Sequence, residues 1–162
     1  MTSPAPTPAA LEARWTAALH AGTRRVTRQR LAVLAAVEQA PHSTADDVVA
    51  SVRAALPRIT VQSVYVVLAD LTELGLLRRI ETPQSPARYE TRVHDNHHHA
   101  VCTGCGRIED VDCAVGHAPC LTPDWSAGSR GMTIQIAEVI YQGLCDDCRA
   151  SQQATPDLPP TP

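Results

Sequence analysis

Residues 59–80 read ITVQSVYVVLADLTELGLLRRI, and within this stretch the chain changes from a helical pattern to a strand pattern. Thr60 is a typical N-cap, because its hydroxyl accepts a hydrogen bond from the first turn of a helix. Gly75 marks the end of that helix, since glycine readily adopts the left-handed conformation that follows a last turn. Beyond it, residues 76–91 predict two short strands joined by a turn that contains proline.

Three further helices are predicted upstream, each with a start or stop signal. They are residues 9–21, a helix from a cap at Thr27 to Pro41, and a helix from a cap at Ser43 or Thr44 to Pro57. The last three of these four helices, followed by a hairpin and with arginines clustered in them, have the order of a winged helix-turn-helix. The recognition helix would then be roughly residues 60–74. An ordinary helical bundle with a hairpin fits the same order.

The second half of the chain alternates in the manner of strands. The candidates are residues 97–102 (HHHAVC), 106–112 (GRIEDVD) and 133–145 (TIQIAEVIYQGLC). The segment between the last two is rich in glycine and proline, so any helix in it must be short.

These patterns predict an α+β fold with two domains. An N-terminal winged helix-turn-helix domain occupies residues 10–88, and a small C-terminal α/β domain occupies residues 89–150. Residues 1–9 and 151–162 are polar and proline-rich, which is typical of disordered tails.

Charge is divided unevenly between the two halves. The net charge of −3 alone argues against a nucleic-acid partner. Residues 1–80, however, hold nine arginines against six acidic residues, whereas residues 81–162 hold five against eleven. This asymmetry indicates two halves with different partners. No apolar run is long enough to span a membrane and no signal peptide is visible, so we expect a cytoplasmic protein with reduced thiols.

Four cysteines form two CxxC pairs, Cys102 with Cys105 and Cys145 with Cys148, each at the end of a predicted strand. Two such pairs supply four thiolates, the tetrahedral set that structural zinc prefers. A thioredoxin-like redox pair and a rubredoxin-type iron site are the alternatives. The redox alternative needs a CxxC that opens a helix in a βα unit, and that context is absent from the sequence pattern.

The histidine tract predicts a second, chemically different site. On a strand, His97 and His99 point to one face and His98 to the other. Together with Asp110, and with Glu90 and His42 from the first half, they offer three imidazoles and two carboxylates. Such a set suits Fe(II), Mn(II), Zn(II) or Ni(II). A solvated surface tract without a metal is the simpler alternative.

With these motifs in place, the chain resembles the ferric uptake regulator family. The similarity lies in RVTRQRLAVLAAV, ITVQSVYVVLADLTELGLLRRI, RYETRVHDNHHHAVCTGCGRIEDVD and YQGLCDDC, and spans roughly residues 10–149. DNHHH, DVDCAVGHAPCL and AEVIYQGLC resemble the actinobacterial FurA/CatR branch, which is linked to repression of catalase-peroxidase genes. The resemblance implies a homodimer that binds a pseudo-palindromic operator in double-stranded DNA.

The resemblance also assigns residues by position. It implies structural zinc on Cys102, Cys105, Cys145 and Cys148, and a sensory metal, Fe(II) or Mn(II), on His42, Glu90, His97, His99 and Asp110. His98 and His117 would form a third metal site, for which a solvated pair is the alternative. DNA contacts would come from Arg24, Arg25, Arg28, Arg30, Arg58, Gln62, Ser63 and Tyr65.

One residue and one segment depart from the pattern of the family. Val66 stands where the family often has an arginine after the recognition tyrosine, and the glycine- and proline-rich segment replaces a helix of the dimerisation domain.

The expected function is a metal-dependent repressor that responds to peroxide. The resemblance to the FurA/CatR branch favours peroxide, and so does Asp110, where iron-level sensors of the family more often have glutamate. The alternatives are a plain iron, zinc or nickel sensor and, from another class, a metalloenzyme.

Overall fold

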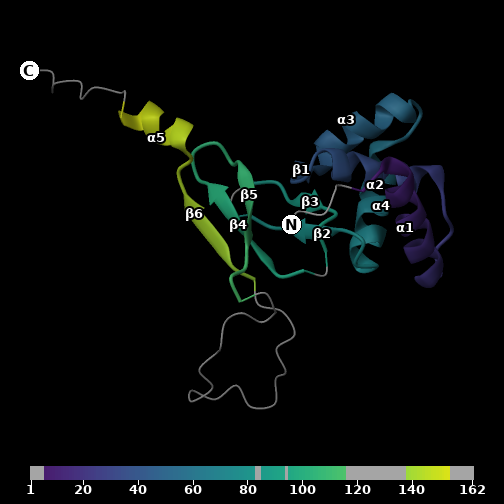
Figure 1. Ribbon diagram of the computed structural model, residues 1–162. Helices are drawn as coiled ribbons and strands as arrows, with labels where there is room; N and C mark the ends of the chain where they lie inside the picture. The colour runs from purple at the N-terminus through teal and green to yellow at the C-terminus, as the bar shows by residue number, and fades with distance from the viewer. Residues whose placement is uncertain (1–5, 83–84, 94, 116–137, 154–162) are drawn as a thin grey trace, which may run out of the picture. The chain divides into compact units, whose positions relative to one another are not determined.

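A computed structural model of the chain describes residues 6–82, 85–93, 95–115 and 138–153. The chain divides into two compact units, Met1–Val93 and His94–Pro162, whose elements are labelled in Figure 1. The predicted domain boundary after residue 88 cuts the strand Arg88–Glu90 after its first residue. In the structure the whole strand belongs to the first unit. None of the described helices is both long and apolar enough to cross a membrane.

The first unit has the predicted winged helix-turn-helix order. Its elements are α1 (Pro8–Ala21), α2 (Arg28–Gln39), β1 (Ser43–Thr44), α3 (Ala45–Ala55), α4 (Val61–Glu73), β2 (Arg78–Ile80) and β3 (Arg88–Glu90). The strands form an antiparallel sheet in the order β1-β3-β2. The two-residue strand β1 was not predicted, because it is too short to show a pattern and exists only through its pairing with β3.

The helix boundaries follow the predicted capping residues. Thr27, Thr44 and Thr60 are the N-caps of α2, α3 and α4, and each hydroxyl accepts a backbone N–H bond. Thr44, rather than Ser43, caps α3 and forms a reciprocal capping box with Asp47. Gly75, just past α4, has φ of 67°, a conformation that costs glycine little.

A single hydrophobic core holds the helices together. Its fully buried members include Leu19, Leu34, Val64, Leu68 and Leu71, which come from α1, α2 and α4. On α4, Val64, Leu68 and Leu71 recur at helical spacing and so bury one face. The opposite face of α4, with Tyr65 and Val66, is left exposed.

The second unit is a three-stranded sheet followed by a short helix. Its elements are β4 (His97–Cys102), β5 (Ile108–Asp112), β6 (Ile140–Gly143) and α5 (Asp146–Gln153). The central strand β4 pairs with β5 antiparallel and with β6 parallel. The strand predicted over 133–145 is observed as 140–143, and its part up to residue 137 lies outside the described residues.

Two helices extend into segments predicted as tails. α1 begins at Pro8, where Thr7 caps the helix and proline is tolerated in the first turn. α5 runs to Gln153, and its DDCRASQQ sequence has no apolar stripe from which to predict a helix. The acidic residues Asp146 and Asp147 in its first turn favour the helix through its dipole.

Candidate metal centres and DNA-binding face

The four cysteines of the two CxxC pairs converge in the second unit. Cys102 ends β4, Cys105 lies in the turn that follows, Cys145 precedes α5, and Cys148 lies in the first turn of α5. Their sulfur atoms all lie within 4.8 Å of one another, and the Sγ atoms of Cys105 and Cys145 are 3.8 Å apart. Four sulfurs about 2.3 Å from one tetrahedral zinc ion would be about 3.8 Å apart. The cluster therefore fits zinc with only small adjustment.

Backbone groups prepare this cluster for a cation. The backbone N–H of Cys145 donates to the Sγ of Cys102 at 3.3 Å. Together with the N–H of Cys105, it lowers the pKa of Cys102 to about 6, because these bonds favour the thiolate. Hydrogen bonding with the other three thiols raises the pKa of Cys148 to about 12. In such a cluster one thiol loses its proton readily, and a second thiol resists deprotonation until a cation offsets the negative charge of the first thiolate.

Gly104 allows the two CxxC pairs to approach closely. A Cβ atom at this position would lie 2.9 Å from the Sγ of Cys148 and 3.2 Å from a methyl carbon of Leu144. Both distances are shorter than ordinary contacts between such atoms. The glycine in CTGC is thus required by packing against the second pair.

The second unit also brings together three of the five predicted sensory ligands. His97 and His99 lie on one face of β4, with ring centroids 4.9 Å apart, and Asp110 is the cross-strand partner of His99. The Nε2 atoms of His97 and His99 lie 4.0 and 3.8 Å from Oδ1 of Asp110. Neighbouring ligands about 2.1 Å from one metal are roughly 3.0–3.4 Å apart, so each nitrogen would need to move about 1 Å or less toward the carboxylate to share an ion with it.

His97 is already oriented for metal binding. Its Nδ1 lies 2.8 Å from the Oδ1 of Asp95, and a carboxylate oxygen at that distance accepts the Nδ1 proton. In the neutral ring, the Nε2 atom, which faces Asp110, then carries the lone pair. Such a carboxylate behind a ligating histidine commonly fixes the ring. The sequence places Asp95 two residues before His97, but gave no sign of this role.

The first unit contains the other two predicted sensory ligands as a pair. His42 Nε2 lies 3.2 Å from Oε2 of Glu90, whose side chain is buried. His42 has a positive φ of 62°, and its N–H donates to the carbonyl of Tyr89. Arg78, which the sequence had not singled out, lies across from Glu90 on β2 with its Nε 3.5 Å from Oε1.

The remaining histidine and cysteine predictions are only partly described. His98 points to the other face of β4, as alternation requires, and contacts Tyr141 edge-on at 6.1 Å. His117 and Cys120 lie outside the described residues, so the proposed pair with His98 has one described member. Cys113 lies just beyond β5, where its N–H donates to the carbonyl of Asn96.

The recognition helix presents a compact exposed face. Tyr65 is 44% and Val66 56% exposed, and Gln62 is exposed in the first turn, whereas the Ser63 hydroxyl bonds to that of Thr60. The Tyr65 hydroxyl donates to Asp46 on α3 at 3.3 Å, and the negative charge of Asp46 raises the pKa of the phenol. A neutral phenol can still donate a hydrogen bond.

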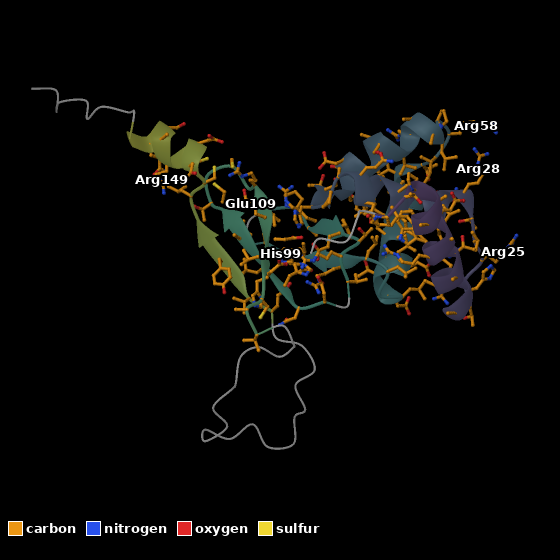
Figure 2. The ribbon with its side chains drawn as sticks, in the orientation of Figure 1. Arg25, Arg28, Arg58, His99, Glu109 and Arg149 are labelled. Carbon is orange, nitrogen blue, oxygen red and sulfur yellow. The ribbon has the colours of Figure 1, made fainter. Side chains whose placement is uncertain are left out.

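The five predicted DNA-contacting arginines fall into two groups. Figure 2 shows Arg25, Arg28 and Arg58 projecting outward on the same side of the helices, and Arg28 and Arg58 line one hollow between α2 and the end of α3. Arg24 and Arg30 instead form ion pairs with Asp70 of α4, at 2.7 and 2.8 Å. Asp70 was not predicted, because its partners lie 46 and 40 residues away.

Comparison with known proteins points to one family. The profile of the ferric uptake regulator family matches residues 21–116. The chain is 54% identical over 127 residues to the transcriptional regulator FurA of Mycobacterium tuberculosis, covering 78% of this chain and 84% of the relative. It is 30% identical over 127 residues to the peroxide operon regulator of Bacillus subtilis, covering 76% and 83%.

A solved structure agrees on the fold. The Helicobacter pylori ferric uptake regulator Fur, described as having three functional metal binding sites, superimposes with a TM-score of 0.65. The alignment covers 91% of this chain and 97% of that one at 18% identity, a level at which the likeness concerns the fold alone.

Proposed function

Because this chain belongs to the ferric uptake regulator family, we propose that it is a metal-dependent transcriptional repressor that responds to peroxide. The relatives named above are a transcriptional regulator and a peroxide operon regulator, which supports regulation rather than catalysis. The metalloenzyme alternative is therefore set aside. The single observation that carries the proposal is the cluster of His97, His99 and Asp110, a nitrogen and oxygen set that suits Fe(II).

The structural metal in this proposal is zinc, held by Cys102, Cys105, Cys145 and Cys148. Four thiolates leave no open coordination position, so such a site stabilises the fold and does not react. The 3.8 Å separation of two sulfurs and the N–H bond to Cys102 support this assignment.

The sensory metal would be held by His42, Glu90, His97, His99 and Asp110. Two of these residues come from the first unit and three from the second. A shared ion would favour conformations in which the two units are held together over those in which they are apart. Fe(II) or Mn(II) fits this mixed ligand set, and Zn(II) or Ni(II) is also compatible with it. The alternative function is a plain sensor of iron, zinc or nickel levels.

Peroxide sensing would use the ligands themselves. When bound, Fe(II) supplies the reducing power that peroxide chemistry requires. The imidazoles of His42 and His97 would then be the oxidisable ligands, and one of them would gain one oxygen atom from peroxide, whose other oxygen would leave as water. A modified imidazole would bind the metal less well, so the proposed link between the two units would be lost. Cys113 and Cys120 offer a competing thiol route, which needs an accessible thiolate.

DNA binding would place α4 in the major groove of the operator. A homodimer reads two half-sites of a pseudo-palindrome with two such helices. In this proposal Tyr65, Gln62 and Ser63 would read bases, and the outward-projecting Arg25, Arg28 and Arg58 would contact phosphates. The proposed location is the cytoplasm, where the operator is accessible.

The test is binding to the promoter region of the chain's own gene, followed by fluorescence anisotropy. Protein loaded with Fe(II) and protein loaded with Mn(II) should both bind, and peroxide should release only the Fe(II) form. Mass spectrometry should then find an increase of about 16 Da, one oxygen, on the peptide with His42 or His97. A variant with Cys113→Ser and Cys120→Ser should still respond. If that variant ignores peroxide, the thiol route operates; if metal has no effect on binding, the proposal fails.

A further inference from the structure

The ion pairs around Asp70 connect the arginine-rich segment to the recognition helix. Oδ1 of Asp70 accepts from Nε of Arg24 at 2.7 Å, and Oδ2 accepts from Nε of Arg30 at 2.8 Å. The Asp70 side chain is only 16% exposed. Burial alone would raise the pKa of Asp70, but the bonds and charges of the two arginines more than offset it, and the pKa lies below the usual range.

Both arginines use their Nε to bond Asp70, and Arg30 also engages its two other nitrogens. Arg30 uses Nε and Nη2 for Asp70, and its Nη1 donates to the backbone carbonyl of Arg25 at 2.9 Å. Arg24 adds a longer contact of 3.9 Å with Glu73. A guanidinium that already bonds a largely buried carboxylate gains less from approaching a phosphate, because it must first break that charge-assisted bond.

The cluster also lies beside the face that would meet DNA. Arg30 lines a hollow between the first turn of α2 and α4, together with Gln62, Ser63 and Val66. Asp70 follows Val66 by one helical turn, and residues four apart lie on the same face of a helix. Arg30 would therefore reach DNA phosphates near this hollow if Asp70 did not hold it.

We propose that Asp70 is a positioning residue that withholds Arg24 and Arg30 from DNA phosphates and leaves phosphate contact in this segment to Arg25 and Arg28. The proposal rests on the DNA-binding function proposed above. It divides the arginines by their partners: Arg25 and Arg28 are exposed, while the other two are held by a carboxylate. Asp70 thereby limits sequence-independent affinity and fixes α4 against α2, so that binding depends more on base contacts.

The experiment compares native protein with Asp70→Asn, using the promoter fragment and an unrelated duplex at several salt concentrations. Each freed arginine that meets a phosphate should steepen the slope of log affinity against log salt by about 0.9, or ~1.8 for both. Affinity for the unrelated duplex should rise roughly 2- to 25-fold at low salt. The promoter should gain less, because α4 loses its attachment to α2, so the specificity ratio falls.

Glu73→Gln is the matched control. It removes the same charge from the same helix, but Glu73 is 76% exposed and lies 3.9 Å from Arg24, so no arginine is freed. Its slope should equal that of the native protein. Adding Arg24→Ala and Arg30→Ala to Asp70→Asn should return the slope to the native value. A purely structural Asp70 would instead weaken binding to both duplexes without changing the slope.

Arg24→Gln and Arg30→Gln keep the proposal testable if Asp70→Asn does not fold. Each should leave the native salt slope unchanged, whereas Arg28→Gln should reduce it by about 0.9. A reduction for Arg24→Gln or Arg30→Gln, or an unchanged slope for folded Asp70→Asn, overturns the proposal. If native protein binds neither duplex with or without metal, the proposed function fails as well; if native protein binds and only these slopes disagree, this inference alone fails.

Discussion

Replacing Gly104 with alanine should weaken the thiolate site without replacing any ligand. The new Cβ would lie 2.9 Å from the Sγ of Cys148 and 3.1 Å from its Cβ. Ordinary carbon contacts are ~3.5–4.0 Å, so the sulfur or the turn must move by on the order of 0.6 Å. Metal sites hold ligand distances to within about 0.2 Å, so the displacement cannot be absorbed by the metal bonds.

The magnitude follows from the cost of overpacking. Extra atoms in a close-packed site cost about 1–3 kcal/mol. If this cost falls on the zinc-bound state, the affinity for zinc decreases roughly 5- to 150-fold. Competition with a chromophoric chelator measures the affinity directly. Thermal unfolding should show a lower Tm for the zinc-loaded variant, because the binding energy of structural zinc is also folding energy.

Gly143→Ala is the control for this experiment. Gly143 lies at the end of β6, one residue before Leu144, and a Cβ there meets nothing within 4 Å. It should bind zinc like native protein. If Gly104→Ala also binds zinc with native affinity, the close approach of Cys148 to the CTGC turn is not a feature of the zinc-bound protein, and Cys148 loses its assignment as a ligand.

Three further outcomes are expected. The pKa of Asp70 is lower in the folded protein than in the unfolded chain, where it is ~4. The native protein should therefore be more stable than Asp70→Asn by the full amount above pH ~4, and this difference should decline as the pH falls through the folded pKa. Urea denaturation at several pH values measures the difference. Thr44→Ala should lose the capping box with Asp47 and about 1 kcal/mol, whereas Thr44→Ser should retain most of it, as thermal unfolding will report. Arg28→Ala should weaken binding to all duplexes alike, whereas Tyr65→Ala should reduce preference for the promoter, and equal losses on both duplexes would remove Tyr65 from base recognition.

Features governed by neighbours in sequence were predictable. The threonine caps and Gly75 act within one turn of the helices that they bound, so their positions indicated where α2, α3 and α4 begin and where α4 ends. Strand alternation likewise placed His97 and His99 on one face and His98 on the other. The two CxxC spacings predicted a four-thiol cluster, and the four sulfurs do converge.

Features that depend on distant partners were not predictable. β1 exists because Ser43 and Thr44 pair with β3. Thr44 pairs with Arg88, which lies 44 residues further along the chain. The contacts of Asp70 depend on how α4 packs against α2, and no local pattern distinguishes Asp70 from an ordinary solvated acid. The polar helix α5 follows directly from Cys145, so its position is linked to the thiol cluster more than to its own sequence.

The position of the thiol cluster suits the proposal that β4 contributes ligands to two metals of different chemistry. Cys102 ends β4, and its N–H and carbonyl bond to Arg107 and Gly106 across the turn that contains Cys105. A zinc ion that fixes this turn also fixes the register in which His99 faces Asp110. A slip of one residue would move Asp110 to the opposite face and break the nitrogen and oxygen set. With zinc bound, the thiolate site would therefore stabilise the geometry of the proposed sensory ligands, and its closed ligand set would leave zinc no part in their chemistry.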